Sequence, residues 1–205
     1  MTIPILAQRM VHYAELLVKI GVNLQPAQSL NIAAELGHRD FVKEVVGAAY
    51  RAGAKYVNVD WIDAPSLRMR YLHSQPEYLD ELPDFAVAMR HEWLDQNWAR
   101  LALIGDEFPG IFDDVEPASM QRVQKTRARL MRFFSEAQMA NKIAWCVAGV
   151  PTPAWASKVY PHLSAEQAVA QLWDEILRLV RADQLDEVVW SDRRGGTRRV
   201  AVVRP

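Results

Sequence analysis

Residues 30–61, LNIAAELGHRDFVKEVVGAAYRAGAKYVNVDW, decide the fold. Apolar and polar side chains alternate at both ends of this stretch, in 30–36 and again in 57–61, with the two-residue period of a β-strand. Between them an apolar stripe recurs at helical spacing, with Asp40 placed to cap its start and Gly53 to end it. A strand, a helix and a second strand in this order predict two parallel strands joined by a right-handed crossover.

The same alternation of strands and helices continues outward from this unit. Further helices are predicted over 6–18, 65–74, 84–99, 119–137 and 164–180, and further strands over 101–104 and 143–147. Ser164 and Gln167 have the spacing of a capping box at the start of the last helix. We therefore predict one α/β domain over residues 1–182, with an open, mainly parallel sheet of about four or more strands and helices on both faces.

Residues 183–205 differ from the rest of the chain. The periodic pattern ends there, and 191–205 hold five arginines against one aspartate. One interpretation is a short, solvated basic tail. The other is an out-of-frame reading of a GC-rich gene, since arginine, glycine, valine, alanine and proline share GC-rich codons. The residues leave both interpretations open.

Composition excludes several classes of protein. The 24 lysines and arginines nearly balance the 25 aspartates and glutamates, so no overall field favours nucleic acid or an anionic membrane. Cys146 is the single cysteine, which rules out a disulfide within the chain and fits a reducing compartment. Neither a signal peptide nor an apolar stretch of membrane-spanning length is evident. We expect a cytoplasmic protein that binds no nucleic acid and no membrane.

A search for catalytic chemistry finds no complete motif. The sequence lacks the metal-binding pattern H-E-x-x-H, the nucleophile pattern G-x-S-x-G and the glycine-rich phosphate loops. The nearest approach is His91-Glu92 with Asp95, in which His91 and Asp95 are four residues apart on a predicted helix; such pairs are common on solvated helix faces. Cys146 lies inside a predicted apolar strand, which favours an inert thiol. We predict no catalytic and no metal-binding residue in this chain.

One general rule still indicates where a ligand would bind. In open parallel sheets, ligands lie beyond the carboxyl ends of the strands. These ends carry Glu35, His38, Asp60, Trp61, Asp106, Glu107, Pro151, Thr152 and Trp155. Asp60 and Trp61 are candidates to contact a peptide, although an aspartate at a strand end more often caps the next turn.

Four stretches of the chain resemble a known family. They are NLQPAQSLNI (23–32), AAYRAGAKYVNVDW (48–61), AWCVAGVPTPAWASKVYP (144–161) and LWDEILRLVRAD (172–183). Their sequence and their order resemble the amino-terminal domain of the aminopeptidase T and S metallopeptidases, the thermophilic metalloprotease family. The resemblance covers roughly residues 5–183, and the PTPAWA segment is its most distinctive part.

The resemblance implies a two-domain, usually dimeric enzyme that removes amino-terminal residues from peptides with two divalent metal ions. In that family the metal ligands and the catalytic acid/base lie in the second domain, which we expect this chain to lack. The chain would then be inactive alone, bind no metal itself, and pair with a missing catalytic domain or with itself. Residues Pro151, Thr152 and Trp155 become the candidate interdomain contact.

Two alternatives remain open beside this interpretation. One is a stand-alone binding or interaction module derived from the same domain. The other is an independent enzyme that uses His91, Glu92 and Asp95.

Overall fold

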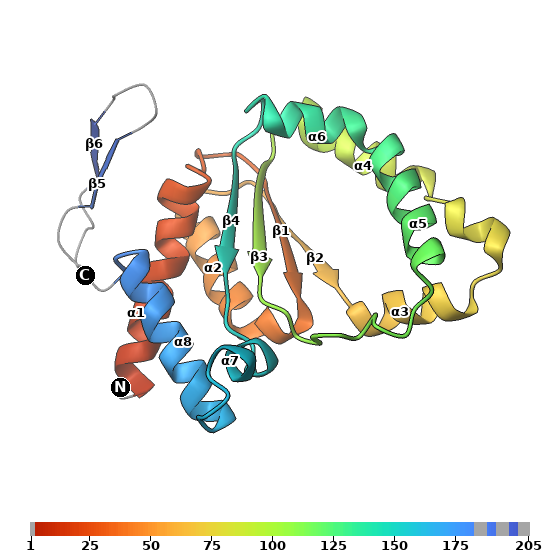
Figure 1. The fold of residues 1–205 in the computed structure, drawn as a ribbon. Coiled ribbons are helices and arrows are strands. Elements are labelled where there is room, and N and C mark those ends of the chain that lie inside the picture. Colours follow the sequence, from red (N-terminus) through yellow and green to blue (C-terminus); the bar gives the residue numbers. More distant parts are fainter. Residues whose placement is uncertain (1–2, 183–187, 192–196, 201–205) are drawn as a thin grey trace.

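The strand–helix–strand unit predicted from residues 30–61 is present at the centre of the domain (Figure 1). The computed structural model describes residues 3–182, 188–191 and 197–200. Strands β1 (Leu30–Glu35) and β2 (Val57–Ile62) are parallel, with Leu30 opposite Val57. A short 3₁₀ turn and helix α2 (Arg39–Arg51) connect them.

The other elements follow in the predicted order. Before the unit lie α1 (Ile3–Leu16) and a π-helical turn, η1 (Leu17–Gly21). After it come α3 (Ala64–His73), the 3₁₀ turn η3 (Pro76–Asp80), α4 (Asp84–Asp95), β3 (Ala99–Ile104), α5 (Pro117–Leu130), α6 (Arg132–Met139), β4 (Trp145–Gly149), α7 (Pro153–Val159) and α8 (Ala165–Leu179). The capping box predicted from Ser164 and Gln167 begins α8.

The sheet confirms the predicted fold class. Its four strands have the order β2-β1-β3-β4, and each neighbouring pair is parallel. Helices α1, α2 and α8 lie on one side of the sheet, and α4, α5 and α6 lie on the other (Figure 1). We call the side toward α1 the first face and the side toward α4 the second face.

The first face carries the main core. Every second residue of the strands packs there against α1, α2 and α8, including Leu30, Ile32 and Leu101, all with no exposed surface. Tyr13, Phe41 and Trp173 join these helices through ring contacts, with centroid distances of 5.2 Å for Tyr13–Phe41 and 5.5 Å for Phe41–Trp173. Aromatic burial of this kind is a large part of the stability of such a core.

The second face divides into two halves. Toward the amino ends of the strands it carries Asn31, Asn58 and Arg100, which share a row of the sheet. Helices α4 and α6 cover this half with a separate apolar cluster around Trp93, Phe134 and Ile143. Toward the carboxyl ends, apolar side chains of this face stay exposed: Ile62 at 47%, Ile104 at 55% and Val147 at 46%.

One prediction within residues 30–61 needs correction. Asn31 lies opposite the apolar side chains of its strand, as the alternating pattern indicates, and it is 1% exposed because the second face is covered at that point. Asp40 is not the cap of α2: His38 precedes the helix, and Asp40 lies in its first turn, where its charge favours the helix dipole. Gly53 takes a positive φ of 91° just after α2, as its predicted role requires.

The connections on the second face also differ from prediction. The helix predicted over 84–99 is shorter, because Asn97 takes a left-handed φ of 51° after α4. The helix predicted over 119–137 is two helices, divided at Met131, whose φ of −99° and ψ of 8° interrupt the helix. Residues 151–153, predicted only as a strand break, also begin α7, in which Pro153 fits the first turn.

Part of the segment 183–205 forms a small hairpin. Strands β5 (Val188–Ser191) and β6 (Thr197–Val200) are antiparallel and form a separate two-stranded sheet. The remaining positions of 183–205 lie outside the described residues. The prediction that the α/β domain ends at residue 182 stays a prediction.

Replacing Phe41 should test the importance of the first-face core. Phe41→Ala should lower the free energy of unfolding by about 3–5 kcal/mol, because Phe41 is 2% exposed and its removal leaves a cavity between two rings. Phe85, which is 71% exposed on α4, provides the control, and Phe85→Ala should change the value by less than about 0.5 kcal/mol. Equal losses in urea unfolding would contradict this account of the core.

Candidate functional site

The carboxyl ends of the four parallel strands lie at one edge of the sheet (Figure 1). The residues predicted from strand ends are therefore at this edge, but they do not form one site. Asp60 and Trp61 end β2, whereas Pro151, Thr152 and Trp155 follow β4, at the opposite side of the sheet. Two strands separate β2 from β4, a distance of roughly 14 Å at the usual strand spacing.

Glu35 and Glu107 join the loops that follow β1 and β3. The backbone N–H of Glu107 donates to Glu35 Oε2 at 2.8 Å, and the backbone N–H of Gly37 donates to Glu107 Oε2 at 2.9 Å. Burial raises the pKa of Glu35, and the charges of Asp106 and Glu107 add to this effect, while the hydrogen bond from Glu107 opposes it. The carboxylates of Glu35 and Glu107 thus connect the loop after β1 to the loop after β3.

His38 is the most deeply buried ionisable group of this edge. It has no exposed surface, and its Nε2 lies 3.1 Å from the carbonyl oxygen of Gly105, which can only accept. Its Nδ1 has no hydrogen-bond partner among the described residues. Burial lowers the pKa of His38. A Cβ atom on Gly105 would overlap the carbonyl oxygen of Val150, so the loops after β3 and β4 approach closely here.

Thr152 links the loop after β4 to the loop after β3. It is fully buried, and its hydroxyl donates to the carbonyl oxygen of Asp106 at 2.5 Å. Thr152 Oγ1 also accepts the backbone N–H of Trp155 and so caps the start of α7. Pro151 is buried beside it, and Trp155 packs against a small cluster around Ala156. These contacts give the segment a local structural role; its predicted interdomain contact stays a prediction.

Asp60 and Trp61 lie on opposite faces of β2. Trp61 is 42% exposed. Asp60 does not cap the following turn as expected; it accepts hydrogen bonds from Asn58 Nδ2 at 2.9 Å and from Arg90 Nη2 at 3.3 Å on the second face. Asn58 Nδ2 also donates to Asn31 Oδ1 at 2.8 Å.

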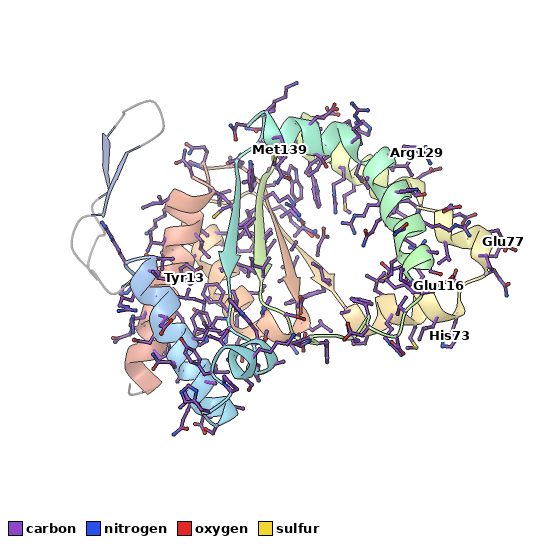
Figure 2. The ribbon with its side chains drawn as sticks, viewed as in Figure 1. Tyr13, His73, Glu77, Glu116, Arg129 and Met139 are labelled. Atoms are coloured by element: carbon purple, nitrogen blue, oxygen red, sulfur yellow. The ribbon has the colours of Figure 1, made fainter. Side chains whose placement is uncertain are left out.

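The sequence search missed the arginines beside Asp60. Arg90 comes from α4 and Arg100 from β3. Side chains occupy the space between the sheet and helices α4 and α6 (Figure 2). The available signal was Arg100, a charged residue inside the otherwise apolar strand ARLALI. A partly buried charge of this kind needs a partner.

The described residues do not fit a metal site. Within 3–182, 188–191 and 197–200, no group of three or more histidines, cysteines, aspartates or glutamates is arranged to hold a metal ion. His91 is exposed, and its ring stacks on that of Phe133 with centroids 3.9 Å apart. No chemical step through a metal can be derived from these residues.

Cys146 has the properties of an unreactive thiol. It lies in β4, partly packed against the first-face core. Burial raises its pKa, which lowers the fraction of thiolate, the form that acts as a nucleophile.

Among the residues that the structure describes, none of the helices has the length and apolar character of a membrane span.

His38 should make the stability of the domain depend on pH. Because burial lowers its pKa in the folded chain, the unfolded chain binds a proton more readily. Its contribution should be complete above about pH 6.5, the ordinary histidine value, and decline below it by at most about 1.4 kcal/mol per pH unit. His38→Gln should remove this part of the slope in urea unfolding, whereas replacing the exposed His73 should leave it. An unchanged slope in His38→Gln would contradict the assignment.

Comparison with known proteins agrees with the resemblance found in the sequence. The family model described as thermophilic metalloprotease (M29) matches residues 6–199. Aminopeptidase 2 of Geobacillus stearothermophilus is 34% identical over 189 residues, which are 92% of this chain and 46% of that protein. Aminopeptidase T of Thermus thermophilus is 32% identical over 175 residues, 85% of this chain and 43% of that protein.

A solved structure gives the same result. Wild-type AmpT from Thermus thermophilus superposes with a TM-score of 0.77 at 30% sequence identity, over 83% of this chain and 43% of that one. The chain therefore spans slightly less than half the length of the curated relatives it matches. The family match extends to residue 199 and so includes part of the segment 183–205. The resemblance is confirmed, and this chain belongs to the thermophilic metalloprotease (M29) family.

Proposed function

We propose that this chain provides the non-metal-binding half of an aminopeptidase that releases amino-terminal residues from peptides. The second half, which the longer relatives contain, would supply the two divalent metal ions and the catalytic groups. The observation that carries this proposal is the incomplete cover of the second sheet face, in a family whose members are about twice as long. The absence of a metal-binding group among the described residues is compatible with it.

The exposed half of the second face has the chemistry of a buried interface. Both faces of a parallel sheet are normally covered, because its strands are apolar on both sides. Three apolar side chains on three of the four strands are exceptions to this rule, because they are about half exposed: Ile62, Ile104 and Val147. Exposed apolar side chains gathered on one face mark a site of association. We infer that the second half of the enzyme covers them.

A stand-alone interaction module is the second candidate function, and the same exposed face favours it. In that case a separate protein, or a second copy of this chain, would cover Ile104 and Val147. The two candidates differ in whether joining the chain to a metal-binding half restores peptidase activity.

Peptidase assays should separate these possibilities. The purified chain with added zinc, cobalt or manganese should not release p-nitroaniline from leucyl-p-nitroanilide. A chimera should do so, in which residues 1–182 replace the matching segment of the Geobacillus stearothermophilus relative, and a chelator should abolish the activity. Activity of the chain alone that His91→Ala removes would favour the independent enzyme. A folded chimera without activity would favour the interaction module.

Without a covering partner, the chain should associate with itself through the exposed half of the second face. Sedimentation should show dimers or larger species, and Val147→Lys should shift them toward monomer, because a buried lysine at the contact is unfavourable. Met139→Lys is the matched control: Met139 is 64% exposed at the end of α6 (Figure 2), outside this half of the face. A monomeric wild-type chain at high concentration would contradict self-association.

A further inference from the structure

Two partly buried arginines lie on the covered half of the second face, Arg90 and Arg100, and an exposed third arginine, Arg127, is close enough for its charge to act on both. Arg90 comes from α4, Arg100 from β3 and Arg127 from α5. Burial lowers the pKa of Arg90 and of Arg100, and the charge of Arg127 lowers both further. The charge of Arg127 therefore acts on two partly desolvated arginines, for which charge interactions are stronger than in water.

The carboxylate that opposes these charges is Asp60. It is the acidic group that acts on both Arg90 and Arg100, and its oxygens already accept hydrogen bonds from Arg90 and Asn58. Two guanidinium groups thus face one carboxylate, and the charge of Arg127 acts on both of them from nearby. This part of the face has a surplus of positive charge.

Hydrogen-bond donors are also in surplus here. Arg90 Nη1 and Asn31 Nδ2 are buried and have no hydrogen-bond partner among the described residues. The acceptor of Asn31 is satisfied, because its Oδ1 receives the Nδ2 of Asn58 at 2.8 Å. Both unsatisfied atoms are donors, so the matching group is an acceptor. A negatively charged oxygen would satisfy the donors and the charge together.

The structure holds Arg90 in a fixed position. Its guanidinium carbon lies 3.8 Å from the ring centroid of Trp93, and its side chain is 16% exposed. Arg100 Nη1 lies 3.4 Å from Gln138 Oε1, a weak bond that leaves its charge uncompensated. The side chain of Asp60 is 27% exposed, so solvent reaches the group from outside the domain. A ligand could enter by the same route.

We infer that Arg90, Arg100 and Arg127, together with the amide of Asn31, form a binding site for an oxyanion of the carboxylate or phosphate type. Planar guanidinium groups bind such anions with two parallel hydrogen bonds. The inference does not depend on the proposed peptidase function. The same chemistry has two possible sources, a free inorganic oxyanion and the terminal carboxylate of a peptide.

The test is thermal unfolding of the full chain, with millimolar phosphate replacing chloride at constant ionic strength. Phosphate should raise the melting temperature by several degrees in a saturable way, as mass action requires. Arg127→Gln, in an exposed side chain that should not disturb folding, should weaken the apparent affinity about tenfold, and so should Arg100→Gln. Arg132→Gln is the matched control, because Arg132 lies on α6 and already pairs with Glu136 at 2.7 Å.

A second measurement separates binding from a merely structural role. Without phosphate, Arg127→Gln should melt at the same or a higher temperature than the wild type, since it removes a repelling charge. A fall both with and without phosphate would overturn the inference, as would equal phosphate shifts in the wild type, Arg127→Gln and Arg132→Gln. General salting-in or salting-out effects would be the same in all three proteins.

The source of the oxyanion is tested with triglycine and its carboxyl-terminal amide. If triglycine stabilises the wild type and not Arg127→Gln, while the amide stabilises neither, the site binds a peptide carboxylate. If phosphate alone acts through Arg127, the site binds a free oxyanion. If neither phosphate nor triglycine gives a saturable shift, the site does not exist.

Discussion

Burial of the first sheet face against α1, α2 and α8 is the interaction on which the rest of the domain depends. The strand residues of that face are apolar from end to end, and the aromatic rings of Tyr13, Phe41 and Trp173 join the three helices above them. This layer contacts all four strands of the sheet. The second face can therefore carry unusual features: arginines at one end and exposed aliphatic side chains at the other.

The carboxyl edge of the sheet is tied together rather than open. Glu107 bridges two loops, His38 contacts the backbone of Gly105, and Thr152 connects the loops after β3 and β4. These three side chains contact backbone groups of the same domain. In many open parallel sheets this edge binds the ligand; here the second face offers the more suitable chemistry, because its charged groups are less fully matched.

Much of the fold could be predicted because it depends on local patterns. The two-residue and helical periods of residues 30–61 are determined by which side chains face the core, and they gave the parallel unit correctly. The burial of Asn31 could not be read from this pattern, because it depends on α4 and α6, which are distant in sequence. The division of the helix at Met131 likewise has no strong signal, since neither glycine nor proline stands at that position.

The site was harder to predict than the fold for a related reason. Arg90, Arg100 and Arg127 lie on three elements with no shared spacing, so no motif connects them. Asp60 was noticed as a strand-end residue, but its partner Arg90 is 30 residues away. A pattern search finds groups that one element brings together; it does not find groups that meet only after the chain has folded.

The helical layer on the second face has its own small apolar cluster, around Trp93, Phe134 and Ile143, separate from the main core. Charged and amide groups lie between this layer and the sheet, and such contacts add little net stability compared with apolar burial. Amide hydrogens of α4 and α6 should therefore exchange with solvent when this helical layer opens locally. Those of β1 and β3 should exchange only when the whole domain unfolds. The sheet with α1, α2 and α8 would then be the stable part of the domain, and the layer of α4 and α6 the less stable part. A ligand bound between this layer and the sheet would also determine how often the layer opens.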